Sequence, residues 1–205
     1  SETGEVILSG MGELHLEIIM DRAKREHNLD MVTSPPQVAY REAVGGTITH
    51  RETYRKQASG RGRFAEIEIV VSPAPIDQKG LQFVNSTKAS VLSKEFVAAV
   101  EKGIKAAMGT GVMAGYPVYC AKVELVDAVM SSESDALSFE ICGTIAFKEA
   151  TRKIRCNLLE PIMKLEVDTP EEYVGDVTGD INRRRGEITG IEAQVYSTAV
   201  KAIIP

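Results

Sequence analysis

A short stretch of alternating glycine and arginine, Gly60-Arg61-Gly62-Arg63, holds the side chains best suited to bind an anion. Arginine forks bind phosphate through paired hydrogen bonds and stack on nucleobases, while glycine allows close approach of the backbone to a partner. Between residues 51 and 63 there are five basic residues and one acid, a local charge of +4 (Arg51, Arg55, Lys56, Arg61, Arg63; Glu52). The whole chain has a net charge of −5, which excludes a uniformly basic coat but allows a local basic patch.

The string GRGRFA, residues 60–65, also fits a loose dinucleotide-binding fingerprint, G-x-G-x-x-A. That fingerprint requires a strand before it and a helix after it, because the helix N-terminus receives the pyrophosphate. An alternating, strand-like segment follows here, so we reject a dinucleotide site. Two interpretations stay open: the glycines form an ordinary hairpin turn, or the tip contacts structured RNA.

The sequence contains no residue grouping that predicts catalysis or metal binding. His15, His27 and His50 lack metal-ligand spacing, no Ser/His/Asp or Cys/His grouping can be assembled, and no P-loop occurs. The three cysteines form no CxxC pair and indicate reduced thiols in a cytosolic protein. Neither a signal peptide nor an apolar run of the ~18 residues that a membrane helix needs is present. We therefore predict no catalytic residue, no metal, no cofactor in this chain and no membrane partner.

The elements on either side of the glycine–arginine stretch alternate with period two. This pattern predicts two long strands, over residues 47–57 and 63–73, joined by the stretch itself. A helix is predicted over residues 93–108, with Ser93 as its N-cap and one apolar face (Phe96, Val100, Ile104, Ala107). A strand is predicted over residues 118–129. A polar loop and a helix with apolar positions at Ile141, Ile145 and Ile154 follow it.

The two ends of the chain repeat one plan of strand, helix and strand. In the first, over residues 4–34, Ser9 is a candidate N-cap, Glu13 suits the first turn and Asn28 can close the helix. A boundary is predicted at residues 34–36. In the second, after a strand at residues 161–170, Thr169 is the predicted N-cap and Glu172 completes a capping box. The chain ends in an extended segment, and we expect an unpaired edge there and both ends to be cut inside domains.

Several strings together resemble translation elongation factor G, the ribosomal translocase, in the order of that family and over the whole chain: SGMGELHLEIIMDRAKREHNL, SPPQVAYRE, SGRGRF, IAFKEA and LEPIMKLEVDTPEEYVGDVTGDINRRRGEITG. The resemblance implies an α+β chain in three parts. Residues 1–34 would be the second half of ferredoxin-like domain III. Residues 35–157 would be domain IV, with a ribosomal protein S5 domain 2-like fold. Residues 158–205 would be the first part of ferredoxin-like domain V. The GTPase domain, with its GTP and Mg, would belong to the parent outside this fragment, which would itself be no enzyme.

The resemblance also implies the partners and the contact residues. Domain IV of the family reaches the tRNA–mRNA duplex and small-subunit rRNA at the decoding region, and domain V touches large-subunit rRNA. The implied contacts are a first tip loop (Ser59, Gly60, Arg61, Gly62, Arg63), a second tip loop (Ser131, Ser132, Glu133, Ser134) and a basic helix end (Arg183, Arg184, Arg185). The last group also suits a plain charge complement to the helix dipole.

Two departures from the family bear on these expectations. The family usually has glutamine where this chain has Arg63, and commonly has a histidine in the second loop, which here reads VMSSESD over residues 129–135. The parent could therefore be the main cytoplasmic translocase or a paralogue devoted to ribosome recycling. An alternative of another class is a protein–protein module that pairs through exposed strand edges, with self-association of the cut half-domains as an artefact of truncation.

Overall fold

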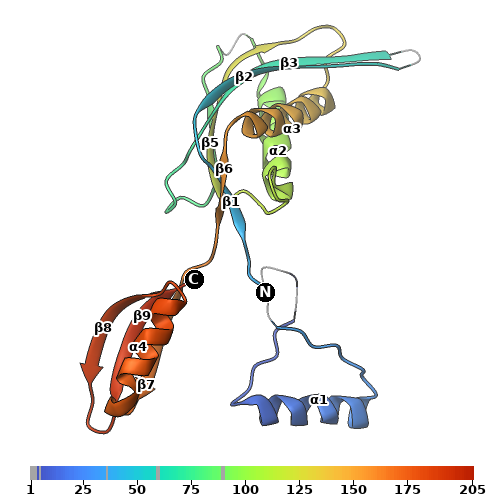
Figure 1. Ribbon diagram of the computed structural model, residues 1–205. Helices are drawn as coiled ribbons and strands as arrows, with labels where there is room; N and C mark the ends of the chain where they lie inside the picture. Colours follow the sequence, from blue (N-terminus) through green and yellow to red (C-terminus); the bar gives the residue numbers. More distant parts are fainter. Residues whose placement is uncertain (1–3, 5, 36, 59–60, 89–90) are drawn as a thin grey trace. The chain divides into compact units, whose positions relative to one another are not determined.

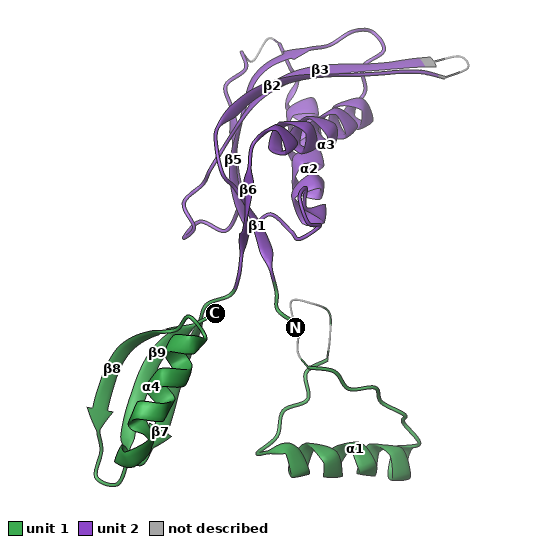
Figure 2. Cartoon of the chain, in the orientation of Figure 1, with its two compact units in different colours: residues 1–39, 161–205 green, residues 40–160 purple. Residues whose placement is uncertain are grey.

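The structure, a computed structural model, describes residues 4, 6–35, 37–58, 61–88 and 91–205. Within these residues the chain forms four α-helices and three small sheets, which confirms the predicted α+β class. It divides into two compact units, one of residues 40–160 (unit 2) and one of residues 1–39 and 161–205 (unit 1; Figure 2). No helix among the described residues is long and apolar enough to cross a membrane.

Unit 2 is built on a four-stranded sheet in the order β2-β3-β5-β4 (Figure 1). Its strands are β2 (Ile48–Ala58), β3 (Arg61–Ser72), β4 (Gly80–Asn85) and β5 (Cys120–Val129). β3 pairs antiparallel with both β2 and β5, and β4 pairs parallel with β5. The three strands predicted from alternation are confirmed, whereas β4 was not predicted.

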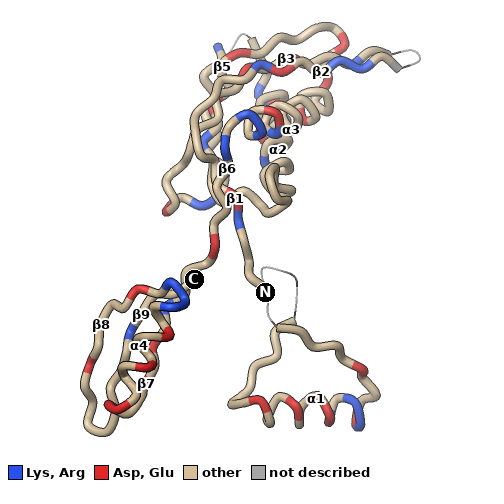
Figure 3. Tube along the Cα trace, viewed as in Figure 1, with Lys and Arg blue, Asp and Glu red and all other residues tan. Residues whose placement is uncertain are grey.

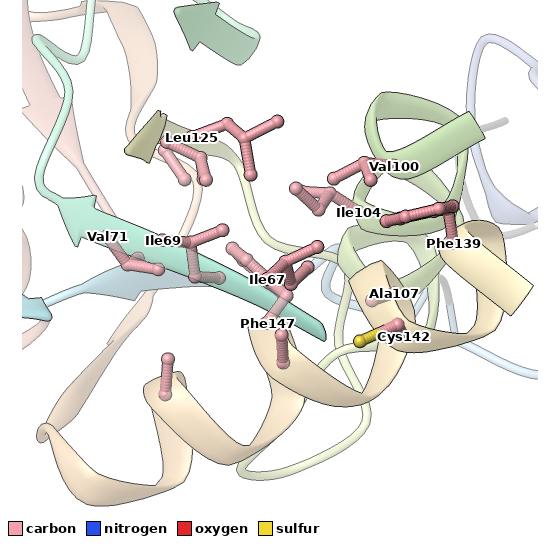
Figure 4. Packing of buried hydrophobic residues seen from close by; sticks show 14 of the residues in the cluster. Ile67, Ile69, Val71, Val100, Ile104, Ala107, Leu125, Phe139, Cys142 and Phe147 are labelled. Carbon is pink, nitrogen blue, oxygen red and sulfur yellow. The ribbon is translucent and has the colours of Figure 1, made fainter. Parts of the chain in front are cut away.

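Two helices, α2 (Lys94–Thr110) and α3 (Ala136–Lys153), cover one face of this sheet. Along the inner part of β3, every second side chain points toward the helices and is fully buried, as expected for a half-buried strand (Ala65, Ile67, Ile69, Val71). Figure 4 shows Ile67, Ile69 and Val71 in one cluster with Val100 and Ile104 of α2 and Phe147 of α3. The predicted N-cap of α2 is confirmed, since the Ser93 hydroxyl accepts the Phe96 N–H at 3.4 Å.

The helix predicted after the polar loop is confirmed as α3, but the isoleucines noted in its sequence do not form its buried face. Ile141 and Ile145 are only half-buried and Ile154 follows the helix, whereas other α3 residues fill the core (Phe139, Cys142, Ala146, Phe147, Ala150). The reason is close contact between the two helices. A side chain at Gly143 would come within 2.8 Å of the Val100 carbonyl oxygen, so the small residues of α3 must face α2.

A second, two-stranded sheet joins β1 (Arg41–Val44) to β6 (Cys156–Leu159). On β1 the side chain of Glu42 is fully buried. Its carboxylate accepts four backbone N–H groups, from Val112, Met113, Ala114 and Tyr116, at 2.7, 3.0, 2.7 and 3.2 Å. Burial opposes the charge, but the four hydrogen bonds outweigh it and hold the pKa of Glu42 below its ordinary value. Glu42 therefore fixes the loop after α2.

The N-terminal segment contains one helix, α1 (Glu13–His27), and no described residue before Arg41 lies in a strand. The strands predicted on either side of α1 are therefore wrong, and so is Ser9 as the cap, because Gly12 holds that position without a side-chain hydrogen bond. A strand forms only where a neighbour completes its ladder, and none of the described residues does so here. Asn28 closes the helix in the left-handed region at φ 52°, as predicted.

The C-terminal segment forms a three-stranded sheet, β7-β9-β8, with helix α4 packed on it. Its elements are β7 (Met163–Thr169), the 3-10 turn η1 (Glu171–Tyr173), α4 (Val174–Arg183), β8 (Glu187–Ala193) and β9 (Thr198–Ile204). The predicted capping box is wrong, because Thr169 pairs with Thr198 in the β7–β9 ladder and stays in the strand. The expected unpaired final strand is also wrong, since β9 lies between two partners.

Candidate RNA-contacting tip

The hairpin of β2 and β3 extends beyond the part of the sheet that the helices cover (Figure 1). On β3 the fully buried positions begin at Ala65, which lies opposite Tyr54 of β2. Between that pair and the end of the hairpin the register continues without a shift to Ala58 opposite Arg61. The outer hairpin is therefore held by the antiparallel ladder more than by core packing.

The predicted first loop is partly a strand. Arg61, Gly62 and Arg63 belong to β3, because ladder pairing continues to the last residue of β2. Ser59 and Gly60 lie outside the described residues, as does the side chain of Arg61. Of the five predicted contact residues, the structure thus describes the side-chain surroundings of Gly62 and Arg63.

Basic residues gather on the outer hairpin, where Figure 3 marks their positions along β2 in blue. Arg55 and Lys56 are exposed, and neither forms an ion pair with a residue that the structure describes. Lys56 lies directly opposite Arg63 in the ladder. Like charges that face each other across two strands destabilise the pair, so this position is unfavourable unless an anion lies nearby.

Arg51 belongs to a different environment from the tip. Its guanidinium reaches three carboxylates, those of Glu66, Glu68 and Asp127, at 2.8, 3.1 and 2.8 Å. These hydrogen bonds raise the pKa of Arg51 above its ordinary value. Arg51 is therefore neutralised within the sheet, and the basic tip consists of fewer cations than the sequence suggests.

The second predicted loop lies against the hairpin. The Ser134 hydroxyl donates to the Phe64 carbonyl at 2.7 Å, and the Phe64 N–H donates to the Glu133 carbonyl at 3.4 Å. Ser131 closes the loop on itself, because its N–H donates to the Ser134 hydroxyl at 2.9 Å and its carbonyl accepts the Ser134 N–H at 3.1 Å. Ser132 is exposed. The structure thus brings the two predicted stretches together, although 70 residues separate Ser134 from Phe64.

Two carboxylates of this loop meet the hairpin. The Arg63 Nε lies 3.2 Å from Asp135 Oδ2. The Glu133 carboxylate lies over Gly62, so that a side-chain carbon at Gly62 would be 2.5–2.6 Å from all three of its heavy atoms. Gly62 is therefore the residue that allows the second loop to lie close to the strand.

Asp135 is a site residue that sequence reasoning missed. It is the N-cap of α3, where its Oδ1 accepts the Ser138 N–H at 2.6 Å. An aspartate just before an apolar helical pattern is a recognisable helix start, so this role could have been read from the sequence. Its pairing with Arg63 could not, because that contact depends on where the loop lies.

The basic end of α4, in unit 1, is partly neutralised by its own helix. Arg184 Nε lies 2.8 Å from Asp180 Oδ2, and Arg183 Nη1 lies 4.0 Å from Asp180 Oδ1. Arg185 adopts a left-handed conformation at φ 65°, and the next N–H, of Gly186, donates to the Ile181 carbonyl at 2.9 Å. This is the geometry of a Schellman helix end, so a structural role accounts for Arg185.

Comparison with models of known protein families identifies the family of this chain. The family model for elongation factor G, domain IV, matches residues 36–155, more than half of the chain. The chain belongs to the elongation factor G family. Models for elongation factor G domain III and for the elongation factor G C-terminus match residues 1–35 and 157–205.

Curated relatives agree with this assignment. Elongation factor G of Amoebophilus asiaticus and that of Cytophaga hutchinsonii are each 47% identical over 205 residues, and this chain covers 29% of each. A crystal structure of a Thermus thermophilus protein superposes with a TM-score of 0.88 at 34% identity, covering 100% of this chain and 30% of that one. The chain thus spans less than a third of the length of the two elongation factor G relatives. The three models that it matches are those of domain III, domain IV and the C-terminus.

Proposed function

We propose that this chain is the RNA-contacting part of an elongation factor G, and that the end of the β2–β3 hairpin meets tRNA–mRNA and small-subunit rRNA at the decoding region. The chain would promote translocation by occupying space beside the tRNA–mRNA duplex and stabilising its position, without bond chemistry of its own. GTP hydrolysis, with Mg, would take place in a GTPase domain of the whole factor and would bias the orientation of this part. Such a factor would work in the cytoplasm.

One observation carries this proposal. Lys56 faces Arg63 across the hairpin ladder, with Arg55 next to them, at the end of the unit that extends beyond the helices. Like charges opposite each other repel; Asp135, 3.2 Å from Arg63, offsets part of this repulsion, and the phosphates of a polyanion would offset it further. Arginine and lysine on a ladder-held tip suit contact with phosphates more than a plain solvated turn does.

The finer layout of the whole factor belongs to the same proposal. Residues 1–34 would be the second half of ferredoxin-like domain III, and residues 158–205 the first part of ferredoxin-like domain V. Residues 35–157 would form domain IV with an S5 domain 2-like fold. Through Arg183 and its neighbours, domain V would touch large-subunit rRNA. Arg183 suits this role best, because its side chain is 83% exposed while Arg184 is held by Asp180 at 2.8 Å.

A recycling paralogue is the second candidate, and the serine-rich, acidic second loop favours it, since the family commonly has a histidine there. A module that pairs through strand edges is less well supported. Its main basis was an unpaired final strand, and β9 is paired on both sides.

A chimera separates these candidates. This chain would replace the matching region of the 47%-identical Amoebophilus asiaticus elongation factor G. Single-round translocation and ribosome splitting would then be measured for the chimera and for its Arg61→Ala/Arg63→Ala variant. We expect translocation, slowed in the variant by about tenfold or more for two lost phosphate contacts, with GTP hydrolysis retained.

The control for this experiment is Arg152→Ala, which removes an exposed arginine whose Nη1 lies 2.5 Å from Glu149 on α3. We expect that control to translocate at the rate of the unmodified chimera. Splitting without translocation would assign the recycling role. Equal translocation by the tip variant and the control would remove the tip from the mechanism.

A further inference from the structure

We propose that the second loop is a built-in counter-anion of the hairpin tip. Glu133 and Asp135 occupy the positions that phosphates of RNA take, so RNA binds by displacing them, and their charge sets the affinity of the tip. This inference rests on the proposed function, because it names what regulates the same site.

The contact between Arg63 and Asp135 is suited to exchange. The two side chains are 42% and 45% exposed, so water and a competing anion reach both. An exposed ion pair of this kind contributes little stability, and breaking it costs correspondingly little. A phosphate that approaches Arg63 therefore competes with an exposed, weakly bound carboxylate, that of Asp135.

Asp135 is the fixed member of the pair and Arg63 the mobile one. Asp135 cannot turn away freely, because its Oδ1 accepts the Ser138 N–H at 2.6 Å as the cap of α3. Arg63 has a long side chain with no second carboxylate among the described ion pairs. The exchange therefore moves the guanidinium from a fixed carboxylate toward the incoming phosphate.

The Glu133 side chain covers the backbone of Gly62, which a binding partner could otherwise approach closely. Its carboxylate lies flat over Gly62, while the loop backbone beneath it is held by the Phe64 N–H at 3.4 Å from the Glu133 carbonyl. The backbone of Glu133 is thus anchored and its exposed side chain is free to rotate away. Close approach of RNA to Gly62 requires that rotation.

The second loop offsets part of the positive charge of the hairpin tip. The carboxylate of Asp135 lies beside Arg63 and that of Glu133 lies over Gly62, next to the exposed cations Arg55 and Lys56 on the paired strand, so removing either carboxylate leaves the tip more positive. Removing one carboxylate should raise RNA affinity by about threefold and by no more than about fivefold, the limit set by an exposed pair. It should also make the dependence of log affinity on log salt steeper by about 0.7, for one added phosphate contact to a single strand.

The test uses the whole 205-residue chain and a fluorescently labelled single-stranded RNA, with affinity measured by anisotropy over a range of salt concentrations. Asp135→Asn keeps the helix cap, because asparagine caps as well as aspartate, and removes the charge. Glu133→Gln removes the other charge. Gly62→Ala leaves the charge unchanged and pushes the Glu133 carboxylate away, since the three atoms nearest to an added methyl belong to that flexible end.

Glu101→Gln is the matched control. It raises the net charge by the same amount and releases Lys105, which lies 2.6 Å from Glu101 on α2, away from the hairpin. We expect the three tip variants to bind RNA more tightly than wild type and the control to match wild type. If the wild type binds RNA and the tip variants behave like Glu101→Gln, the inference is wrong while the proposed function stands.

A second measurement tests the Arg63–Asp135 contact independently of RNA binding. The NMR resonance of the Arg63 Nε–H should shift in Asp135→Asn, and tripolyphosphate should shift it further in that variant than in wild type. That result together with no RNA binding by any variant would retain the counter-anion and reject the RNA function. An Arg63 resonance that Asp135→Asn leaves unchanged would overturn the inference directly.

Discussion

Carboxylates play opposite parts at the two ends of unit 2. At the β1 end, Glu42 is fully buried and takes four backbone N–H groups, so it cannot leave its place without stranding them. At the hairpin end, Asp135 pairs with Arg63 where solvent reaches both side chains, and the exposed Glu133 carboxylate lies over Gly62. The same chemical group is thus a fixed structural part in one place and an exchangeable one in the other, and burial makes the difference.

Glycines repeat this contrast. A side-chain carbon at Gly103 would lie 2.0 Å from the Glu140 carbonyl oxygen, which is backbone of the helix packed against α2. At Gly62 the three heavy atoms nearest to the same carbon would be those of the Glu133 carboxylate, the end of a flexible side chain. A side chain therefore cannot be added between the helices without moving backbone. At the hairpin end only a flexible side chain would have to move, and a surface that accepts a partner needs this freedom.

Replacing Glu42 should give the largest effect. Glu42→Gln keeps the shape but turns an NH2 group toward N–H donors, which leaves buried donors unpaired. We expect a loss of about 3–5 kcal/mol in the free energy of unfolding, measured by urea denaturation followed by circular dichroism. Glu101→Gln, an exposed acid in a surface pair, should change it by less than about 0.5 kcal/mol. Equal losses would erase the proposed difference between buried and exposed acids.

Gly103→Ala tests the contact between the helices. Alanine favours a helix by about 1 kcal/mol over glycine, but the added carbon forces α2 and α3 apart. We expect a net loss of about 2 kcal/mol in the free energy of unfolding. Gly62→Ala should leave that free energy within about 0.5 kcal/mol of wild type. A neutral Gly103→Ala would show that the helices can separate at little cost.

Lowering the pH should reduce the stability that Glu42 contributes. The pKa of Glu42 is lowered in the folded chain, so its contribution to stability is fully present above the ordinary value of 4.5 and is lost as the pH falls through the folded pKa. The stability advantage of wild type over Glu42→Gln should therefore stay constant between about pH 7 and about pH 5.5, and should shrink as the pH falls below 4.5. A constant advantage from pH 7 down to about pH 3.5 would show that folding does not lower the pKa of Glu42.

Much of the central sheet could be predicted because alternation along β2, β3 and β5 matches their burial. The buried face of α3 could not, since small residues such as Gly143 face α2 and leave the larger Ile141 and Ile145 partly exposed. Burial of Glu42 had no local signature, because its partners lie some 70 residues away in the chain.

For the candidate site, the sequence indicated both stretches but not their contact. Local composition identified the basic hairpin and the polar second loop. Whether Arg63 faces solvent or Asp135 depends on where α3 begins and how the loop returns to β3, and these are tertiary features. The cap at Thr169 failed for a similar reason, because pairing with Thr198 overrode a local helix-start pattern.

The most direct test of the central claim locates the tip on the ribosome. Gln57 is exposed on the outer part of β2 and Thr110 is exposed at the end of α2, so each can be replaced by cysteine to carry a tethered iron chelate in the chimera. A Cys156→Ser background removes the half-buried thiol. Cys120 and Cys142 are buried, and burial raises the pKa of Cys142 to about 12, so they should not be labelled.

Hydroxyl radicals generated from the Gln57→Cys chimera should cleave small-subunit rRNA at the decoding region, and those from Thr110→Cys should leave that region intact. Cleavage of the decoding region from Thr110→Cys but not from Gln57→Cys would contradict the account, because a part of unit 2 other than the basic hairpin would then be the end that meets RNA.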